Sequence, residues 1–139
     1  MNPVAIFWPM VAHAFLACLI YALLAYRRRI AVVSGAVRPN HFKTRTEEPA
    51  VSAAVAANLL NQFELPVLFH AVCLALFATN GVSFVAVALA WLFIVARYLH
   101  AFVHVTSNDL RYRSPLFAAG FVILVVLWIW FSLHLLGAV

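Results

Sequence analysis

Residues 65–96 read LPVLFHAVCLALFATNGVSFVAVALAWLFIVA and contain no charged side chain. An α-helix needs about 20 apolar residues to cross a hydrocarbon core of about 30 Å. The stretch is therefore too long for one membrane span and accounts for most of two. Thr79-Asn80-Gly81 is typical of a turn. This part of the sequence predicts an antiparallel hairpin of two transmembrane helices.

Two further spans flank this hairpin. Residues 4–26 carry no formal charge, and we expect Asn2 and Pro3 to begin this first helix as N-cap and N1. Ser114 and Pro115 have the same pattern before an uncharged run that reaches Val139. The second helix is expected to start near Pro49. The predicted spans of this single domain are 4–26, 58–78, 83–106 and 115–138.

The composition agrees with a membrane protein and excludes a soluble or disordered one. The 139 residues are 67% hydrophobic and only 9% charged. Soluble domains are about 45–50% apolar and about 25% charged, and a domain of this size could not bury so much apolar surface. We therefore predict an all-α, integral membrane four-helix bundle.

The basic residues indicate orientation rather than nucleic-acid binding. The net charge is +5, and the Lys and Arg residues outside the spans fall in two loops, six in 27–45 and two in 111–113. By the positive-inside rule, loops 27–50 and 107–114 face the cytoplasm and both termini face the other side. No basic stretch has the interleaved aromatic residues expected of a nucleic-acid site.

Polar side chains form two stripes within the spans, where ionisable residues are costly and usually functional. On the third span, the stripe falls within an arc of about 100° if one helix continues to its end. It comprises Arg97, His100, His104, Ser107, Asn108 and Arg111. On the second span, the stripe comprises Asn58, Asn61, Gln62 and Glu64.

The hairpin brings these stripes to the same depth. Glu64 precedes Asn80 by 16 residues and Arg97 follows it by 17. Both then lie about 24–26 Å from the turn, and we expect them to form an ion pair at one edge of a polar cleft near the cytoplasmic interface. A ligand site is one interpretation of the cleft. Polar contacts that only hold two helices in register are the other.

A metal site is a weaker interpretation. His100 and His104 have i,i+4 spacing and Glu64 is close in depth, so a two-His-one-carboxylate site is conceivable. Arg97 lies one turn from His100 and would repel a dication, so we predict no metal. His13, His70 and His134 lie singly on apolar helices, and we expect them to be buried and hydrogen-bonded.

Two segments resemble the MAPEG family of membrane-associated proteins in eicosanoid and glutathione metabolism, with the bacterial members most similar. They are NLLNQFELPVLFHAV (58–72) and ARYLHAFVHVTSNDLRYRSPLFAAG (96–120). The resemblance implies a homotrimer in a bacterial inner membrane, with glutathione sites between protomers that open to the cytoplasm. It also implies that Asn61 and Glu64 contact glutathione and that Arg111 stabilises its thiolate as the catalytic residue.

The sequence departs from the family pattern at three positions. Ala57 stands where the family enzymes usually have an arginine, and His100 and His104 stand where the eicosanoid synthases have tyrosines. The predicted ligand-binding residues are Asn58, Asn61, Glu64, Arg97, His100 and His104.

Two functions remain open on this basis. One is an enzyme, a transferase or peroxidase that uses glutathione or a related thiol as co-substrate on apolar small molecules from the bilayer. A guanidinium beside a thiol would raise its thiolate fraction. The other is a non-catalytic membrane protein that binds a lipid or a partner helix, which Ala57 favours because one carboxylate clamp is missing.

Overall fold

The computed structural model describes residues 2–43 and 47–139, and every regular element within them is helical. Four helical segments in this part of the chain are long and apolar enough to cross a membrane. They are Pro3–Val33, Ala50–Ala78, Phe84–Val105 and Leu110–Leu135. The prediction of an all-α membrane protein with four spans is confirmed.

The first span begins as predicted but ends later. A short 3₁₀ helix, η1 (Pro3–Ile6), leads directly into α1 (Phe7–Val33). The Asn2 side chain accepts a hydrogen bond from the Val4 amide at 3.0 Å, which confirms its capping role. α1 continues past Arg27–Arg29 to Val33, seven residues beyond the expected span of 4–26. The arginines therefore lie on the last turns of the helix rather than in a loop.

The polar connection after α1 is tied to that helix end. It contains a second 3₁₀ helix, η2 (Pro39–Lys43), while Arg45, counted among the basic loop residues, lies outside the described residues. Arg28 donates to both carboxylate oxygens of Glu48, at 2.9 and 2.7 Å. Ser52 donates to the same carboxylate at 2.7 Å. This bidentate pair fixes the start of the second span against α1.

The second span is two helices rather than one. α2 (Ala50–Asn61), with Pro49 at its N-cap as expected, ends before α3 (Leu65–Ala78) begins. Pro66 has no amide hydrogen, so it cannot donate to the carbonyl of Gln62, and its ring opposes a continuous helix at that carbonyl. Glu64 adopts φ −95° and ψ −100° at the break. The predicted span over 58–78 is therefore divided between two helices, within a segment, Ala50–Ala78, that is long and apolar enough to cross a membrane.

The fourth span begins earlier than predicted. α4 (Phe84–Val105) is capped by Ser83, which accepts from the Ala86 amide at 3.2 Å. Asn108 then adopts a positive φ of 52°. Asp109 accepts from the Arg111 amide at 2.9 Å and starts α5 (Leu110–Leu135), with Pro115 inside the helix. The predicted N-cap at Ser114 is wrong because the Asp109 carboxylate already caps the helix one turn earlier.

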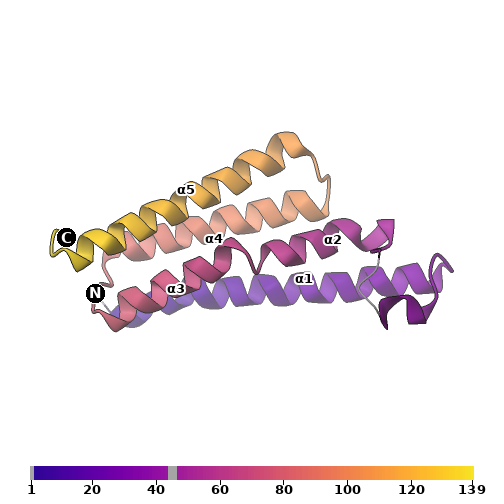
Figure 1. Ribbon diagram of the computed structural model, residues 1–139, viewed down its shortest axis with the longest axis horizontal. Helices are drawn as coiled ribbons and strands as arrows, with labels where there is room; N and C mark the ends of the chain where they lie inside the picture. The colour runs from indigo at the N-terminus through magenta and orange to yellow at the C-terminus, as the bar shows by residue number, and fades with distance from the viewer. Residues whose placement is uncertain (1, 44–46) are drawn as a thin grey trace.

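The helices lie side by side along one axis (Figure 1). α4 packs most extensively against α5, and α1 packs against α2. The connections after α1 and α4 lie at one end of the bundle, and both termini lie at the opposite end with the turn that follows α3 (Figure 1).

The core divides into two apolar clusters. The cluster nearer the termini includes Ile6, Phe69, Val72, Leu76, Phe93, Ile94, Leu124 and Leu127. The cluster nearer the polar connections consists of Leu16, Ile20, Leu24, Val55 and Ala101. A layer of buried polar side chains separates them on three of the four spans, and this layer contains the candidate site.

Candidate functional site

The buried polar layer is built from α1, α2 and α4. His13 lies between Ile6 and Leu16 along α1, and Arg97 and His100 lie between Ile94 and Ala101 along α4. The buried polar side chains of the layer are His13, Asn58, Gln62, Arg97, His100 and His104. Because unpaired polar groups are costly in an apolar interior, their partners decide what the layer can bind.

Arg97 is the centre of this layer. Its side chain is 1% exposed, and its Nη2 donates to the main-chain carbonyl of Asn61 at 2.7 Å. That carbonyl is available because the chain breaks between α2 and α3, so no amide of a continuing helix occupies it. The Nε and Nη1 atoms of Arg97 are buried and have no hydrogen-bond partner.

The predicted ion pair between Glu64 and Arg97 is not formed. Glu64 is exposed at the helix break, and Arg28–Glu48 is the sole ion pair among residues 2–43 and 47–139. The two residues do lie on facing elements, as the depth argument required. The break turns Glu64 off the α2 face, a local effect of Pro66 that the depth argument did not include.

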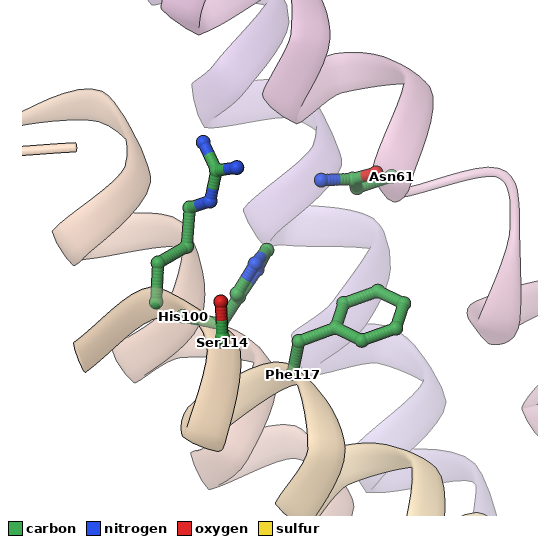
Figure 2. A pocket seen from close by; sticks show the side chains of 5 residues that line it. Asn61, His100, Ser114 and Phe117 are labelled. Atoms are coloured by element: carbon green, nitrogen blue, oxygen red, sulfur yellow. The ribbon is translucent and has the colours of Figure 1, made fainter. Parts of the chain in front are cut away.

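A pocket of about 290 Å³ opens beside Arg97, between the α2–α3 break, α4 and α5. Its lining residues are Asn61, His100, Arg113, Ser114 and Phe117. Figure 2 shows His100, Ser114 and Phe117 on one side of the pocket and Asn61 across from them. The wall therefore combines a guanidinium, an imidazole, an amide and a hydroxyl with one aromatic ring.

The pocket residues of α5 belong to the face that packs on α4. Arg113 and Phe117 are four residues apart, and the same stripe continues through the buried Gly120, Leu124 and Leu127. This face lies directly against Arg97, since a Cβ at Gly120 would be in ordinary van der Waals contact, 3.8 Å, with Arg97 Cδ. Arg113 also donates to the side-chain oxygen of Asn108, which holds its guanidinium over the end of α4.

Arg111 is placed elsewhere. The helix that carries Arg97 ends at Val105, so the predicted stripe does not continue through Ser107 and Asn108 to Arg111. Arg111 lies instead in the first turn of α5, where it is exposed and does not line the pocket. Arg113 is about 200° further round that helix and faces the pocket.

His104 and His100 have different neighbours. The Asn61 side-chain amide lies 3.4 Å from His104 Nδ1, where the amide can donate. His100 packs against Phe117, with ring centroids 5.5 Å apart, and its Nδ1 is buried without a partner. Both histidines therefore lie at the predicted cleft, while Asn58 lies behind it and is fully buried.

Asn58 ends a chain of hydrogen bonds through the bundle interior. Gln62 Nε2 donates to the Asn58 carbonyl and Oδ1, at 3.3 and 2.9 Å, so its Oε1 accepts from His13 Nε2 at 3.3 Å. The neutral His13 ring must then accept at Nδ1 from His70 Nε2, at 3.1 Å. His13 and His70 are thus paired rather than single. Asn58 Nδ2, the last donor of the chain, is buried without a partner.

The two-His-one-carboxylate metal site considered from the sequence would need His100, His104 and Glu64 together. The His100 and His104 rings lie with centroids 5.5 Å apart, and Glu64 is exposed away from them. Within the described ranges, no group of three or more His, Cys, Asp or Glu residues could hold a metal ion.

A second cavity of about 610 Å³ lies between α1, α2 and the connection that precedes α2. It is larger and is lined by Arg28, Glu47 and Glu48, of which Arg28 and Glu48 pair with each other. Ala57, the position of the usual family arginine, lines this cavity. The smaller pocket has the unpaired donors and is the better candidate site.

Sequence reasoning missed Arg113, Ser114 and Phe117. The missed signal was Asn108-Asp109, because an Asp that follows a turn residue is a strong N-cap and starts α5 before Arg113. With that start, Arg113 and Phe117 fall on one face at i,i+4 spacing. The predicted Asn61 and His100 line the pocket, and Arg97 lies directly behind it.

The fold agrees with the comparison to known families. The sequence model of the MAPEG family matches residues 6–133, nearly the whole chain. No protein of curated function and no solved structure matches the sequence. The four spans and the extent of this match lead to one conclusion, that the chain belongs to the MAPEG family.

Proposed function

We propose that this protein is a transferase or peroxidase that uses glutathione or a similar thiol on apolar substrates from the bilayer. The observation that supports this most directly is the pocket in which Arg113, His100, Ser114 and Asn61 present polar groups next to the Phe117 ring. A polar wall suits a peptide thiol, and the ring provides an apolar contact for the second substrate.

The chemistry follows from the charge of the pocket. A guanidinium near a thiol favours the thiolate and lowers the pKa of the thiol, which releases its proton to solvent. In conjugation, the sulfur forms a bond to an electrophilic carbon and the leaving group departs with the electrons of the broken bond. In peroxide reduction, the thiolate sulfur attacks the terminal oxygen of the peroxide and becomes a sulfenic acid, while the O–O bond breaks and the other oxygen leaves as an alkoxide that takes a proton from solvent to form the alcohol. A second thiol then forms the disulfide and releases water.

In this proposal, Arg113 takes the thiolate-stabilising role that the sequence suggested for Arg111. Ser114 can donate a hydrogen bond to the same sulfur, and Asn61 and His104 bind polar groups of the peptide. Glu64, exposed at the helix break, is available for an ammonium group of the ligand. The roles of Arg113, Ser114 and Asn61 are based on their places in the pocket wall, and the role of His104 on its contact with Asn61.

The assembly and orientation are part of the proposal. We infer a homotrimer with its sites between protomers, as the family resemblance implies. The connections that carry the basic residues lie at one end of the bundle (Figure 1), which supports a cytoplasmic location for that end and non-cytoplasmic termini. A bacterial inner membrane would fit this arrangement.

The test is calorimetric titration of glutathione into the detergent-solubilised protein, followed by conjugation of glutathione to chlorodinitrobenzene. We expect Arg113→Ala to lower kcat/KM by at least about tenfold, because a charge-assisted interaction of about 1.5–3 kcal/mol is lost. Arg111→Ala is the matched control, two residues away and outside the pocket, and should change turnover less than about twofold. The reverse order of effects would refute the role of Arg113.

The second candidate is a non-catalytic membrane protein that binds a lipid or a partner helix. Ala57 favours this function, because the arginine that usually clamps a carboxylate of the ligand is missing. Absence of both glutathione binding and thiol-dependent turnover in the wild type would establish this candidate over the enzyme.

A further inference from the structure

The guanidinium of Arg97 lies behind the pocket rather than in it. It touches two of the lining residues directly, because Nη2 donates to the Asn61 carbonyl and its Cζ lies 5.8 Å from the centre of the Phe117 ring. A third lining residue, His100, is one turn further along α4. Phe117 and its neighbours therefore separate the polar pocket from a buried cation.

Among the described residues, no carboxylate lies in contact with this cation, and Glu64 acts on it only from a distance. The sole ion pair in the part of the chain that the structure describes is Arg28–Glu48, and Glu64 is exposed. An uncompensated charge in a low-dielectric interior is costly, so it is retained where something else compensates it in the working state. The Nε and Nη1 atoms still have their hydrogens to donate.

Two neighbouring polar side chains, Asn58 and His100, also have a buried nitrogen without a hydrogen-bond partner among the described residues. Asn58 Nδ2 and His100 Nδ1 are buried without partners, on side chains that are 0% and 2% exposed. Asn58 lies one turn before Asn61 on the helix whose end Arg97 contacts. The hydrogen-bond chain from His70 through His13 and Gln62 engages Asn58 Oδ1, which leaves its amide hydrogens to donate.

We propose that Arg97, with Asn58 and His100, forms a buried subsite for one carboxylate of the bound thiol, reached from the pocket when the Phe117 ring turns aside. An anion would accept from the free hydrogens of Arg97 and compensate its charge, which a water molecule or a neutral group would not. The subsite supplies from α4 the carboxylate clamp that Ala57 cannot supply from α2. This inference rests on the proposed function for the identity of the ligand, but not for its charge.

The first test compares two thiols on two proteins. Glutathione carries carboxylates, and N-acetylcysteinamide carries none. We expect Arg97→Gln, which keeps an amide donor and removes the charge, to weaken glutathione binding by at least about tenfold. Binding of N-acetylcysteinamide should change by less than about twofold. Equal effects on both thiols, or no effect on glutathione, would overturn the subsite.

The second test does not require the protein to use a thiol. Acetate at about 100 mM should raise the melting temperature of the wild type more than its neutral isostere acetamide does, at constant ionic strength. Arg97→Gln should abolish this difference and Arg97→Lys should retain part of it. A shift that persists in Arg97→Gln, or the absence of a shift in the wild type, would overturn the proposal even if glutathione binds.

A variant at Phe117 provides independent evidence if Arg97→Gln does not fold. Phe117→Ala removes the ring that separates Arg97 from the pocket. Acetate should then stabilise the protein at a severalfold lower concentration than in the wild type. An unchanged or higher concentration would contradict the position of the subsite. If the wild type responds to acetate but does not bind glutathione, the subsite stands and the proposed enzyme function fails.

Discussion

Replacement of Arg97 by Met should leave the ligand-free protein about as stable as the wild type, or more stable. The side chain is 1% exposed, makes one hydrogen bond to a main-chain carbonyl and leaves Nε and Nη1 unpaired. An arginine at the centre of a membrane helix costs about 2.5–3.5 kcal/mol relative to water. The lost charge-assisted hydrogen bond is worth about 1.5–3 kcal/mol. The difference is a net change between about −0.5 and +2 kcal/mol in favour of Met.

This result would separate two arrangements of the same residues. Had Arg97 been paired with a buried Glu64, its removal would leave an unpaired buried charge and cost about 3–5 kcal/mol. The measurement is reversible unfolding in mixed micelles, with the free energy compared between the wild type and Arg97→Met. Met is the chosen replacement because its flexible side chain can fill most of the vacated volume. A loss of 3 kcal/mol or more, on the order expected for a broken buried pair, would refute the reasoning.

Three further predictions follow from other contacts. Glu64→Ala should change the free energy of unfolding by less than about 0.5 kcal/mol, since Glu64 is exposed and outside any ion pair; a larger loss would indicate a missing partner. Gly81→Ala should cost about 1–3 kcal/mol because the new Cβ would overlap the His134 ring at Cδ2, and the added His134→Ala change should recover part of this. The hydrogen bonds from Arg28 lower the pKa of Glu48 below its ordinary value. The stability that these hydrogen bonds contribute is complete at any pH above the ordinary pKa of a glutamate and is lost as pH falls through the pKa of Glu48 in the folded protein. The stability difference between wild type and Glu48→Gln should therefore shrink from roughly 0.5 kcal/mol near neutral pH toward zero in acid, and a difference that grows in acid would contradict this.

The helix termini show how local signals compete. Asn2, Ser83 and Pro49 were correctly placed at helix starts because their effect depends on a few neighbouring residues. Ser114-Pro115 has the same local pattern and does not start a helix. Asp109 comes first in the chain, and a helix that has already started continues through a proline in its second turn. Which of two adequate caps is used is decided by the packing of α5 on α4.

In the candidate site, too, some features follow from the local sequence and others depend on how the helices pack. The stripe of Arg97, His100 and His104 on one helix face follows from spacing alone, and so does its approach to Asn61 across an antiparallel hairpin. Spacing and depth did not correctly predict the hydrogen-bond partner of Arg97. Depth arguments place residues to within a turn, whereas the break at Pro66 exposes Glu64 and presents a main-chain carbonyl in its place.

The sequence by itself determined that the helices lie in a bilayer, that the fold is all-α, and at what depth along the spans the polar residues meet. These features follow from apolar length and helical periodicity, which are properties of each segment alone. It also carried the family resemblance that the match over residues 6–133 confirms. Only the tertiary structure decided that Arg113 and not Arg111 faces the pocket, and that Arg97 is buried with no carboxylate of the described residues in contact with it. These outcomes depend on where one helix ends and how the next packs against it, and a rotation of about 100° per residue turns a small error in a helix boundary into a different set of facing side chains.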